Sequence, residues 1–444
     1  MKTDNTAPEL QPGVEAALPR TKGIAVKNGW MRRLVTFLVV FGPGLIVMEA
    51  DNDAGAVSSY TQAGAQYGTK LLWVMLLLLP MTYFVQEMVV RLGIATGKGH
   101  ASMIFERFGK FWGYFSLGDL LLVNFLTLVT EFAGISLAMS QLGVSPYVSV
   151  PTAAVGLIGL VVTGSYRRWE ALTIVLCLLD VTWFVVAWAT HTAAGQIAFD
   201  TLVPQVPAGG ITSNLVFLVI AIVGTTIAPW QLFFQQSAVA DKRLRFKDLR
   251  SARLDTFLGA CFTVAVAGCM MLAGNVLHQR HLEYTDPAQM AVLLGRILGP
   301  WGKTAVLLLM VNAAVLGTTA ISLSSAWAYG EYKKWPHSLE RKLKDAPGFY
   351  GVYAACVCAA GALVLIPKAP LQLIILGVQV LAGVVLPSAI IFLQLLLNDR
   401  EMLGEKWINK PWNNAINWTI ICLFFVLSLI LAAQVVAPSL FPAS

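Results

Sequence analysis

Long apolar runs make up most of the chain, and short polar segments separate them. A helix needs about 20 consecutive apolar residues to cross the hydrocarbon of a bilayer, whereas barrel strands would be about half as long and alternating. Eleven runs have helical length, near residues 34–67, 70–93, 111–142, 147–164, 170–190, 213–238, 252–275, 301–330, 351–366, 370–398 and 412–437. The pattern predicts an all-α integral membrane protein with 11 transmembrane helices.

Composition agrees with this prediction. Of 444 residues, 57% are hydrophobic and 12% are charged, against roughly 25% charged residues in a soluble domain, and the mean hydropathy is +0.69. Residues 1–30 are polar and lack the apolar stretch and small-residue cleavage site of a signal peptide, so we expect a disordered tail. Residues 31–444 then form a single transmembrane domain. All six Cys fall inside predicted spans, which gives no disulfide framework.

The basic residues fix the expected orientation. With the N-terminus in the cytoplasm, 26 of the 31 Lys and Arg residues fall in inner segments, and the outer segments hold only Lys70, Arg280, Arg296, Lys303 and Lys368. This is the positive-inside pattern, and it predicts a cytoplasmic N-terminus and a C-terminus outside. The basic stretch 241–247 then lies beside anionic lipid, and we do not expect it to bind nucleic acid.

Two spans are interrupted in their middle by polar and helix-breaking residues, at 51–55 and at 224–231. A lone Pro or Gly usually only kinks a membrane helix, but these breaks occupy matching places in spans one to five and six to ten. Two halves of five spans each have opposite orientations, which is an inverted repeat. The halves are about 34–190 and 213–398, followed by a last helix at about 412–437. Gly55 and Pro229 are expected to unwind both spans and mark a binding site near the bilayer midplane.

Acidic residues are concentrated at the first break, in the stretch MEADNDAGAV at 48–57. Each of Glu49, Asp51 and Asp53 would cost roughly 2.5–3.5 kcal/mol at a helix centre. Lys and Arg fall only near the ends of the spans, so they do not neutralise these acids at the same depth. Protonation is one solution. A hydrated cavity that receives a cation fits better, because carboxylates and freed carbonyls suit Mg²⁺, Mn²⁺ or Ca²⁺.

Four other acids fall inside predicted spans: Glu87, Glu131, Asp180 and Asp255. Any one of them is as consistent with a structural cap or pair as with an ion path, but the set, without matching cations, favours an ion path. All five His fall in loops or at span ends, so a His-based proton relay within the membrane is not expected.

Several short motifs in this chain resemble the Nramp family of divalent-metal transporters. They are Gly42-Pro-Gly44, Asp53-Ala-Gly55, Gln62-Ala-Gly-Ala65, Leu92–Gly97, Ala228-Pro229, Leu386-Pro387 and Asn398-Asp-Arg400. The resemblance covers most of residues 34–404. It implies a LeuT-type fold of five plus five helices with one further helix, and metal uptake across the plasma membrane by alternating access.

The resemblance also implies which residues face the metal. These are Asp53, Ala56, Thr225 through its carbonyl, Ala228 and Gln379. The essential Asp of the family is kept. Ala56 and Ala228 stand where the family has a metal-binding Asn and Met, so an amide ligand and the soft ligand are lost.

Positions of the family's proton path differ as well. Trp230 and Gln235 stand where the family has His, and Glu131 and Gly134 align with an acidic pair, so one acid is missing. Further residues that could line the ion path are Glu49, Asp51, Asn52 and Gln231.

These departures resemble the magnesium-transporting relatives of the Nramp family, which have a wider site and no proton coupling. They imply a carrier of Mg²⁺ and/or Mn²⁺ as substrate, with no cofactor and no enzymatic activity. Its expected partners are divalent ions and the lipid bilayer, without nucleic acid or a protein partner.

Four alternatives stay open at this stage. One is a proton-coupled Mn²⁺/Fe²⁺ transporter of the ordinary Nramp type. A second is an amino-acid or amine carrier on the same fold, although three acids would repel a substrate carboxylate. A third is an intramembrane aspartyl protease, which needs two Asp on separate helices. The last is a passive channel.

Overall fold

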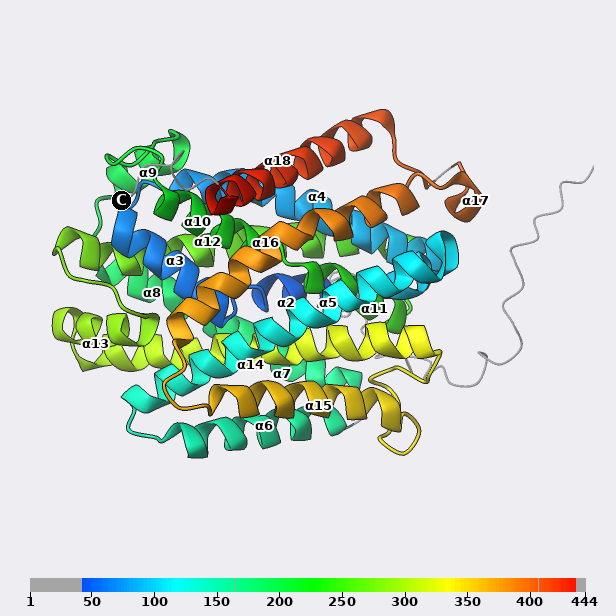
Figure 1. Cartoon of the computed structure of the whole chain (residues 1–444), viewed down its shortest axis with the longest axis horizontal. Coiled ribbons are helices and arrows are strands. Elements are labelled where there is room, and N and C mark those ends of the chain that lie inside the picture. Colours follow the sequence, from blue (N-terminus) through cyan, green and yellow to red (C-terminus); the bar gives the residue numbers. More distant parts are fainter. Residues whose placement is uncertain (1–41, 164, 406, 437–444) are drawn as a thin grey trace, which may run out of the picture. The chain divides into compact units, whose positions relative to one another are not determined.

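The computed structural model describes residues 42–163, 165–405 and 407–436, and within these residues the regular structure is entirely helical (Figure 1). The tail predicted at residues 1–30 lies outside the described residues. The all-α architecture predicted from the apolar runs is therefore confirmed for the part of the chain that the structure describes.

The helices follow the chain in two successive groups. The first group comprises α2 (Pro43–Glu49), α3 (Ala54–Tyr67), α4 (Leu72–Thr96), α5 (His100–Gln141), α6 (Pro146–Val162), α7 (Tyr166–Leu179), α8 (Thr182–Ala189) and the connecting α9 (Ala194–Leu202). The second comprises α10 (Ser213–Thr226), α11 (Pro229–Asp241), η1 (Phe246–Asp248), α12 (Leu249–Gln279), α13 (Pro287–Leu298), α14 (Pro300–Lys333), α15 (Pro347–Val364), α16 (Leu371–Leu396), α17 (Arg400–Leu403) and α18 (Pro411–Val436).

Nine segments of the described chain are long and apolar enough to cross a membrane. The other two predicted spans correspond to the pair α2 and α3, of 7 and 14 residues, and to α6, of 17 residues. The exact number of 11 spans remains a prediction. Helices α9 and α13 were not predicted, and α5 begins at His100 rather than near 111, with a kink where Gly109 has a φ of 82°.

Proline defines where many of these helices begin. Pro43, Pro146, Pro229, Pro287 and Pro300 each occupy the first turn of a helix. The first turn tolerates Pro because its N–H groups have no partner within the helix. The positions of these residues in the sequence therefore set the helix starts directly.

Both predicted breaks are present, but each is narrower than predicted. The first comprises residues 50–53, and Gly55 lies in the first turn of α3, so its predicted place in the break is wrong. The second comprises only Ile227 and Ala228, both with extended or irregular dihedral angles, before Pro229 begins α11.

A third interruption separates α7 from α8 within the fifth predicted span, which corrects the prediction of only two breaks. Asp180 and Val181 keep right-handed dihedral angles. Their N–H groups bond to the carbonyls three residues earlier, at 3.2 and 3.3 Å. The helix is tightened there rather than unwound.

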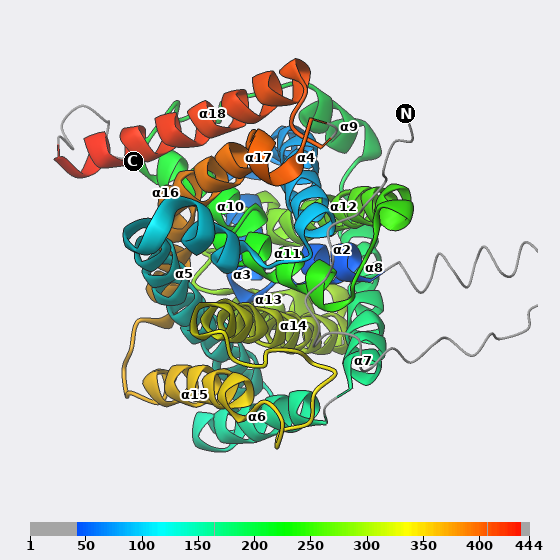
Figure 2. The same cartoon turned by 90° about the vertical axis from the view of Figure 1, so that its right-hand side faces the viewer.

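The broken helices lie inside the bundle, and small residues let them pack closely. Figure 2 shows α2, α3, α10 and α11 in the interior, with α6 beside α15 on one side and α18 on the opposite side. A Cβ on Gly274 of α12 would collide with the carbonyl of Thr61 in α3, and one on Gly224 of α10 with the carbonyl of Gln379 in α16. Such close backbone contacts are typical of membrane helices.

Candidate functional site

Two carboxylates cap the N-terminal end of α3 at the first break. Asp53 is the N-cap residue, and its Oδ1 accepts a hydrogen bond from the N–H of Ala56 at 2.8 Å. Glu131 reaches from α5, and its Oε2 accepts from the N–H of Ala54 at 3.1 Å. Free N–H groups at a helix start need such acceptors and favour negative charge. Both acids are at most 2% exposed.

Asp51 is held by the second broken helix. The Nε2 of Gln231 in α11 donates to Asp51 Oδ1, and Gln231 Oε1 accepts from Gln86 Nε2 of α4 at 2.8 Å. Asp51 Oδ2 is buried and makes no hydrogen bond with any residue that the structure describes. One carboxylate oxygen of Asp51 is therefore available to a ligand.

Glu49 and Asn52 face α12 instead. Thr263 Oγ1 donates to Glu49 Oε1 at 2.8 Å, and Asn52 Nδ2 lies 3.5 Å from Glu49 Oε2 and 3.4 Å from the Thr263 carbonyl. Both oxygens of Glu49 thus have partners, whereas Asn52 Oδ1 has none within the described residues. Of these two side chains, Asn52 is the better candidate for contact with an ion.

The end of α10 supplies freed oxygens. In a helix the carbonyl of Thr225 would accept from the N–H four residues later, but that residue is Pro229, which has no N–H. The Oγ1 of Thr225 is also buried without a hydrogen bond to the described chain. Ala228 is 3% exposed and has extended backbone, with φ −98° and ψ 147°. The carbonyl of Thr225 therefore lacks its usual helical partner, as expected for a carbonyl ligand.

Gln379 of α16 lies between the two breaks. A Cβ on Gly55 would collide with Gln379 Nε2, so the amide lies against the start of α3, next to the buried Ala56. Because a Cβ on Gly224 would collide with the Gln379 carbonyl, the same residue also lies against the end of α10. Gln379 Nε2 has no hydrogen-bond partner among the described residues. The structure therefore brings Asp53, Ala56 and Gln379 to one place beside the end of α10.

Two glycines let α5 and α14 approach the acids. A Cβ on Gly134 would lie 2.5 Å from Ala54 Cβ, so the space at this position is already filled. A Cβ on Gly317 of α14 would lie 2.7 Å from Glu131 Oε2 and 2.9 Å from Asp53 Cβ. Gly317 was not predicted, because no motif distinguishes it from the other glycines of its helix.

Trp230 and Gln235, which stand where the family has His, are buried on α11. Gln235 Nε2 donates to Thr256 Oγ1 at 3.1 Å, and the Trp230 carbonyl accepts from Ser324 Oγ at 2.9 Å. Neither side chain exchanges a proton near neutral pH. Within this pair of positions the site has no titratable group.

Two of the other intramembrane acids have structural partners at their carboxylates, contrary to the ion-path interpretation of the whole set. Asp255 accepts from the N–H groups of Gly44 at 2.8 Å and Leu45 at 3.2 Å, and it thereby caps the N-terminal end of α2. Glu87 forms ion pairs with Arg91 and Arg253. These two acids belong to the framework rather than to the site.

Charge is not balanced at the breaks themselves. Among the ion pairs of the described residues, none includes Glu49, Asp51, Asp53 or Glu131. The same part of the chain has no group of three or more His, Cys, Asp and Glu residues that could hold a metal ion. A cation at this site would therefore bind to one or two carboxylates together with amide and carbonyl oxygens. Such a donor set suits hard divalent cations.

Known proteins resemble this chain over most of its length. A family described as Natural resistance-associated macrophage protein-like (Nramp) matches residues 44–434. The divalent metal cation transporter MntH of Staphylococcus aureus is 24% identical over 430 residues, which cover 90% of this chain and 91% of MntH.

Solved structures agree on the fold. A manganese transporter of Eremococcus coleocola superposes with a TM-score of 0.76 at 17% identity, over 90% of this chain and 88% of that one. MhsT in complex with L-phenylalanine superposes with a TM-score of 0.58 at 14% identity, over 89% of this chain and 98% of that one. The predicted LeuT-type fold is confirmed.

Proposed function

The chain belongs to the Nramp family of membrane transporters, and from this premise we propose that it carries divalent metal cations by alternating access. Transport is the activity of this family, so the chain is not an enzyme. We further propose that Mg²⁺ is accepted as well as Mn²⁺, that the direction is uptake across the plasma membrane, and that no proton moves with the metal.

Carboxylates without a counter-charge at the first break are the observation that supports cation transport. Asp51 keeps one buried oxygen without a hydrogen bond from any described residue, and Asp53 lies between the start of α3 and Glu131. A buried carboxylate without a counter-charge is costly, whereas a cation in transit offsets that cost while it is bound.

Small side chains and the lack of a soft ligand at the site support Mg²⁺. Ala56 stands where the family has Asn, and Ala228 stands where it has Met. The site therefore has neither the amide nor the thioether at these positions. Loss of a soft ligand removes a preference for transition metals. Mg²⁺ gives up its water reluctantly and is usually bound with several waters still attached, so small side chains favour it.

The absence of proton coupling rests on three positions. Trp230 and Gln235 do not titrate, and the space next to Gly134 is filled by Ala54. Glu131 remains beside Asp53 and is the one observation that favours the second candidate, a proton-coupled Mn²⁺ carrier.

Uptake into proteoliposomes tests this proposal. The protein is reconstituted with a trapped pH-sensitive dye, and Mg²⁺ and Mn²⁺ uptake are measured separately and in competition from external pH 5.5 to 8. We expect saturable uptake of both ions without acidification of the interior. Liposomes with the Asp53→Asn variant serve as the matched control.

The other outcomes identify the rivals. Mn²⁺ uptake that acidifies the interior and excludes Mg²⁺ would support the proton-coupled carrier. Flux that does not saturate would indicate a channel. Uptake of labelled amino acids without metal transport would refute the metal assignment altogether.

A further inference from the structure

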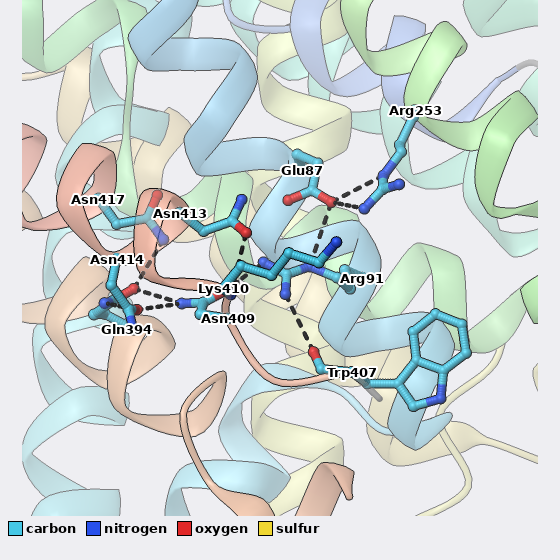
Figure 3. A network of polar contacts seen from close by, with 10 residues as sticks. All are labelled: Glu87, Arg91, Arg253, Gln394, Trp407, Asn409, Lys410, Asn413, Asn414 and Asn417. Atoms are coloured by element: carbon cyan, nitrogen blue, oxygen red, sulfur yellow. Dashed lines mark hydrogen bonds and ion pairs between the residues drawn. The ribbon is translucent and has the colours of Figure 1, made fainter. Parts of the chain in front are cut away.

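The segment Trp407–Lys410, which leads into α18, connects helices that lie far apart in the sequence (Figure 3). Arg91 of α4 donates from Nη1 to the Trp407 carbonyl at 3.2 Å and from Nη2 to Asn409 Oδ1 at 2.6 Å. Arg91 is only 6% exposed. The segment is thus bound to α4 by a buried guanidinium.

Glu87 completes the charged part of this network. Arg253 of α12 donates from Nε to Glu87 Oε1 at 2.9 Å, and Arg91 Nε lies 3.3 Å from the same oxygen. The Arg253 side chain is 43% exposed, so this side of the ion pair lies at the surface of the bundle. The network is therefore tied to α4 and α12.

Asn409 carries the connection onward to α16 and α18. Its Nδ2 donates to Gln394 Oε1 at 2.9 Å and to Asn414 Oδ1 at 3.0 Å, and its N–H donates to the Leu397 carbonyl at 2.9 Å. Both ends of the Asn409 amide thus have partners, on different helices. No other residue drawn in Figure 3 joins Arg91 to Gln394 by its own side chain.

Trp407 adds an apolar contact. Its ring stacks on Phe246 of η1, with centroids 3.7 Å apart and planes at 13°. It also packs against a small cluster, separate from the main core, made of Val90, Ile94, Val239, Leu249 and Ala252. These residues belong to α4, α11 and α12. Small satellite clusters open more easily than a main core.

The opposite end of α16 borders a pocket. A cavity of about 530 Å³ is lined by residues that include Gln62, Tyr284, Asp286 and Gln372. From Gln372 to Gln394 the helix rises roughly 33 Å at 1.5 Å per residue. At this end α16 borders a cavity beside hydrogen bonds from Gln372 Nε2 to Ser58 Oγ at 2.7 Å and Gln62 Oε1 at 3.0 Å, whereas its other end is held by the buried charged network.

We propose that Trp407–Lys410 is a latch that closes the bridged end while the pocket end is open, and that it must release for the transporter to open at the other side. The proposal rests on the proposed transport function only in assigning this motion to the transport cycle. Carriers of this kind populate alternative states, and contacts made in only one state set the balance between them.

Amide hydrogen exchange on the purified, metal-free protein in nanodiscs tests the latch. The test variant is Asn409→Ala, which removes the link between Arg91 and Gln394. The matched control is Asn413→Ala, the same truncation in the same region. Asn413 accepts from the N–H of Lys410 at 3.3 Å and lies outside the path from Arg91 to Gln394.

We expect Asn409→Ala to speed exchange in peptides covering 242–252 and 407–410 by roughly tenfold or more, the effect of losing a hydrogen bond to a charged group. Peptides covering 284–286 and 369–373 should at the same time exchange more slowly, because the pocket end closes when the other end opens. Asn413→Ala removes the acceptor of the Lys410 N–H, so it should speed exchange at that amide alone and leave 242–252 and the pocket end unchanged.

Faster exchange confined to 407–410, with the pocket end unchanged, would overturn the proposal, because it would make the segment a local anchor. If Asn409→Ala does not fold, the same exchange measurement is made on Asn409→Asp. It keeps an acceptor for Arg91 but has no N–H for Gln394 Oε1 and Asn414 Oδ1, so the link to α16 is lost. Exchange at 242–252 should therefore rise and exchange at the pocket end should slow, as expected for Asn409→Ala. No change at either end would contradict the latch. Exchange is read without transport, so these results do not depend on which ion is carried.

Discussion

Glu87 and Asp51 are both buried acids inside the helical bundle, at 5% and 0% exposure, yet their surroundings differ. Glu87 contacts the guanidinium groups of Arg91 and Arg253. Asp51 accepts from a Gln side chain at one oxygen and has no hydrogen bond from a described residue at the other. One acid has its counter-charge in the chain, and the other does not.

This difference separates a structural acid from a binding acid. Removing a charge from water costs several kcal/mol, which a partner in the chain can offset permanently. Where the chain provides no partner, a bound cation offsets this cost only while it is bound. Such a cation can also be released. Glu87 and Asp51 can therefore be told apart by the cations around each carboxylate, whereas Asp255 belongs to the framework through backbone N–H groups instead.

The largest expected effect is that of Asp53→Ala, which removes a carboxylate from the uncompensated region. We expect uptake of Mg²⁺ and Mn²⁺ to fall to background while the protein stays folded, with a loss of about 1 kcal/mol from the missing N-cap. Metal uptake in proteoliposomes and thermal unfolding measure the two effects separately.

Asp53→Asn is the control for capping, because Asn is as good an N-cap residue as Asp. Transport should be lost in this variant too, with stability unchanged. Uptake at the wild-type rate in Asp53→Ala would sink the assignment of this residue as the central ligand.

Patterns local in sequence predicted the helices and the place of the breaks. Apolar runs gave the spans, and the acidic stretch and Pro229 marked the interruptions, because helix starts and stops depend on neighbouring residues. The detail was wrong at Gly55, where a neighbouring cap and a distant side chain both act. Gly55 stays helical because Asp53 caps the helix before it, and Gly55 leaves room for Gln379.

Contacts between helices were not predictable from these patterns. The hydrogen bond from Gln231 to Asp51 joins residues 180 positions apart, and that from Arg91 to Asn409 joins residues 318 positions apart. In the sequence, Arg91 counts only as one positive charge on the inner side. Its pairing with Glu87 follows the helical spacing of four residues, which is visible in the sequence.

The second prediction compares the same chemical change at the two kinds of acid. Glu87→Gln should destabilise the protein by ~3 kcal/mol, the lower end of the range for breaking a buried pair, since Arg253 stays hydrated and Arg91 does not. Asp51→Asn should leave stability unchanged or raise it in metal-free protein, because it removes a buried charge that has no partner.

Thermal unfolding of both variants in chelator measures this contrast. Equal destabilisation by the two substitutions would contradict the distinction between compensated and uncompensated acids. Addition of Mg²⁺ should stabilise the wild-type protein more than Asp51→Asn, by mass action on the folded state.

The third prediction concerns the volume of the site. Ala228→Met restores a thioether and fills space left for water, so it should shift the ratio of Mg²⁺ to Mn²⁺ uptake by roughly tenfold toward Mn²⁺. The double variant with Ala56→Asn should shift selectivity further than either change alone, because neighbouring sites couple.

Competition uptake separates this from a packing effect. If Ala228 only packs against a neighbouring helix, Met would lower transport of both ions in proportion and leave the ratio unchanged.

The smallest effect on stability is expected for a third kind of acid, which pairs with a cation that is exposed at the surface. Asp200 of α9 pairs with Lys70 at 3.0 Å, and the Lys70 side chain is 40% exposed. Burial raises the pKa of Asp200, but hydrogen bonds from Thr69 and Lys70 outweigh it, so the net pKa lies below its usual value. The stability from this group is present above the unfolded pKa near 4 and is lost as pH falls below it.

Lys70→Met should therefore cost less than about 1 kcal/mol at neutral pH, because the cation is exposed to screening although Asp200 is buried, and Asp200 keeps its bonds to Thr69 and Gln205. The loss should shrink as salt is raised or as pH falls below 4, since the pair is then screened or Asp200 is protonated. Thermal unfolding across salt and pH measures it. A cost near that of Glu87→Gln would show that exposure of the cation is not what separates the two framework pairs, and that burial of the acid alone decides the energy.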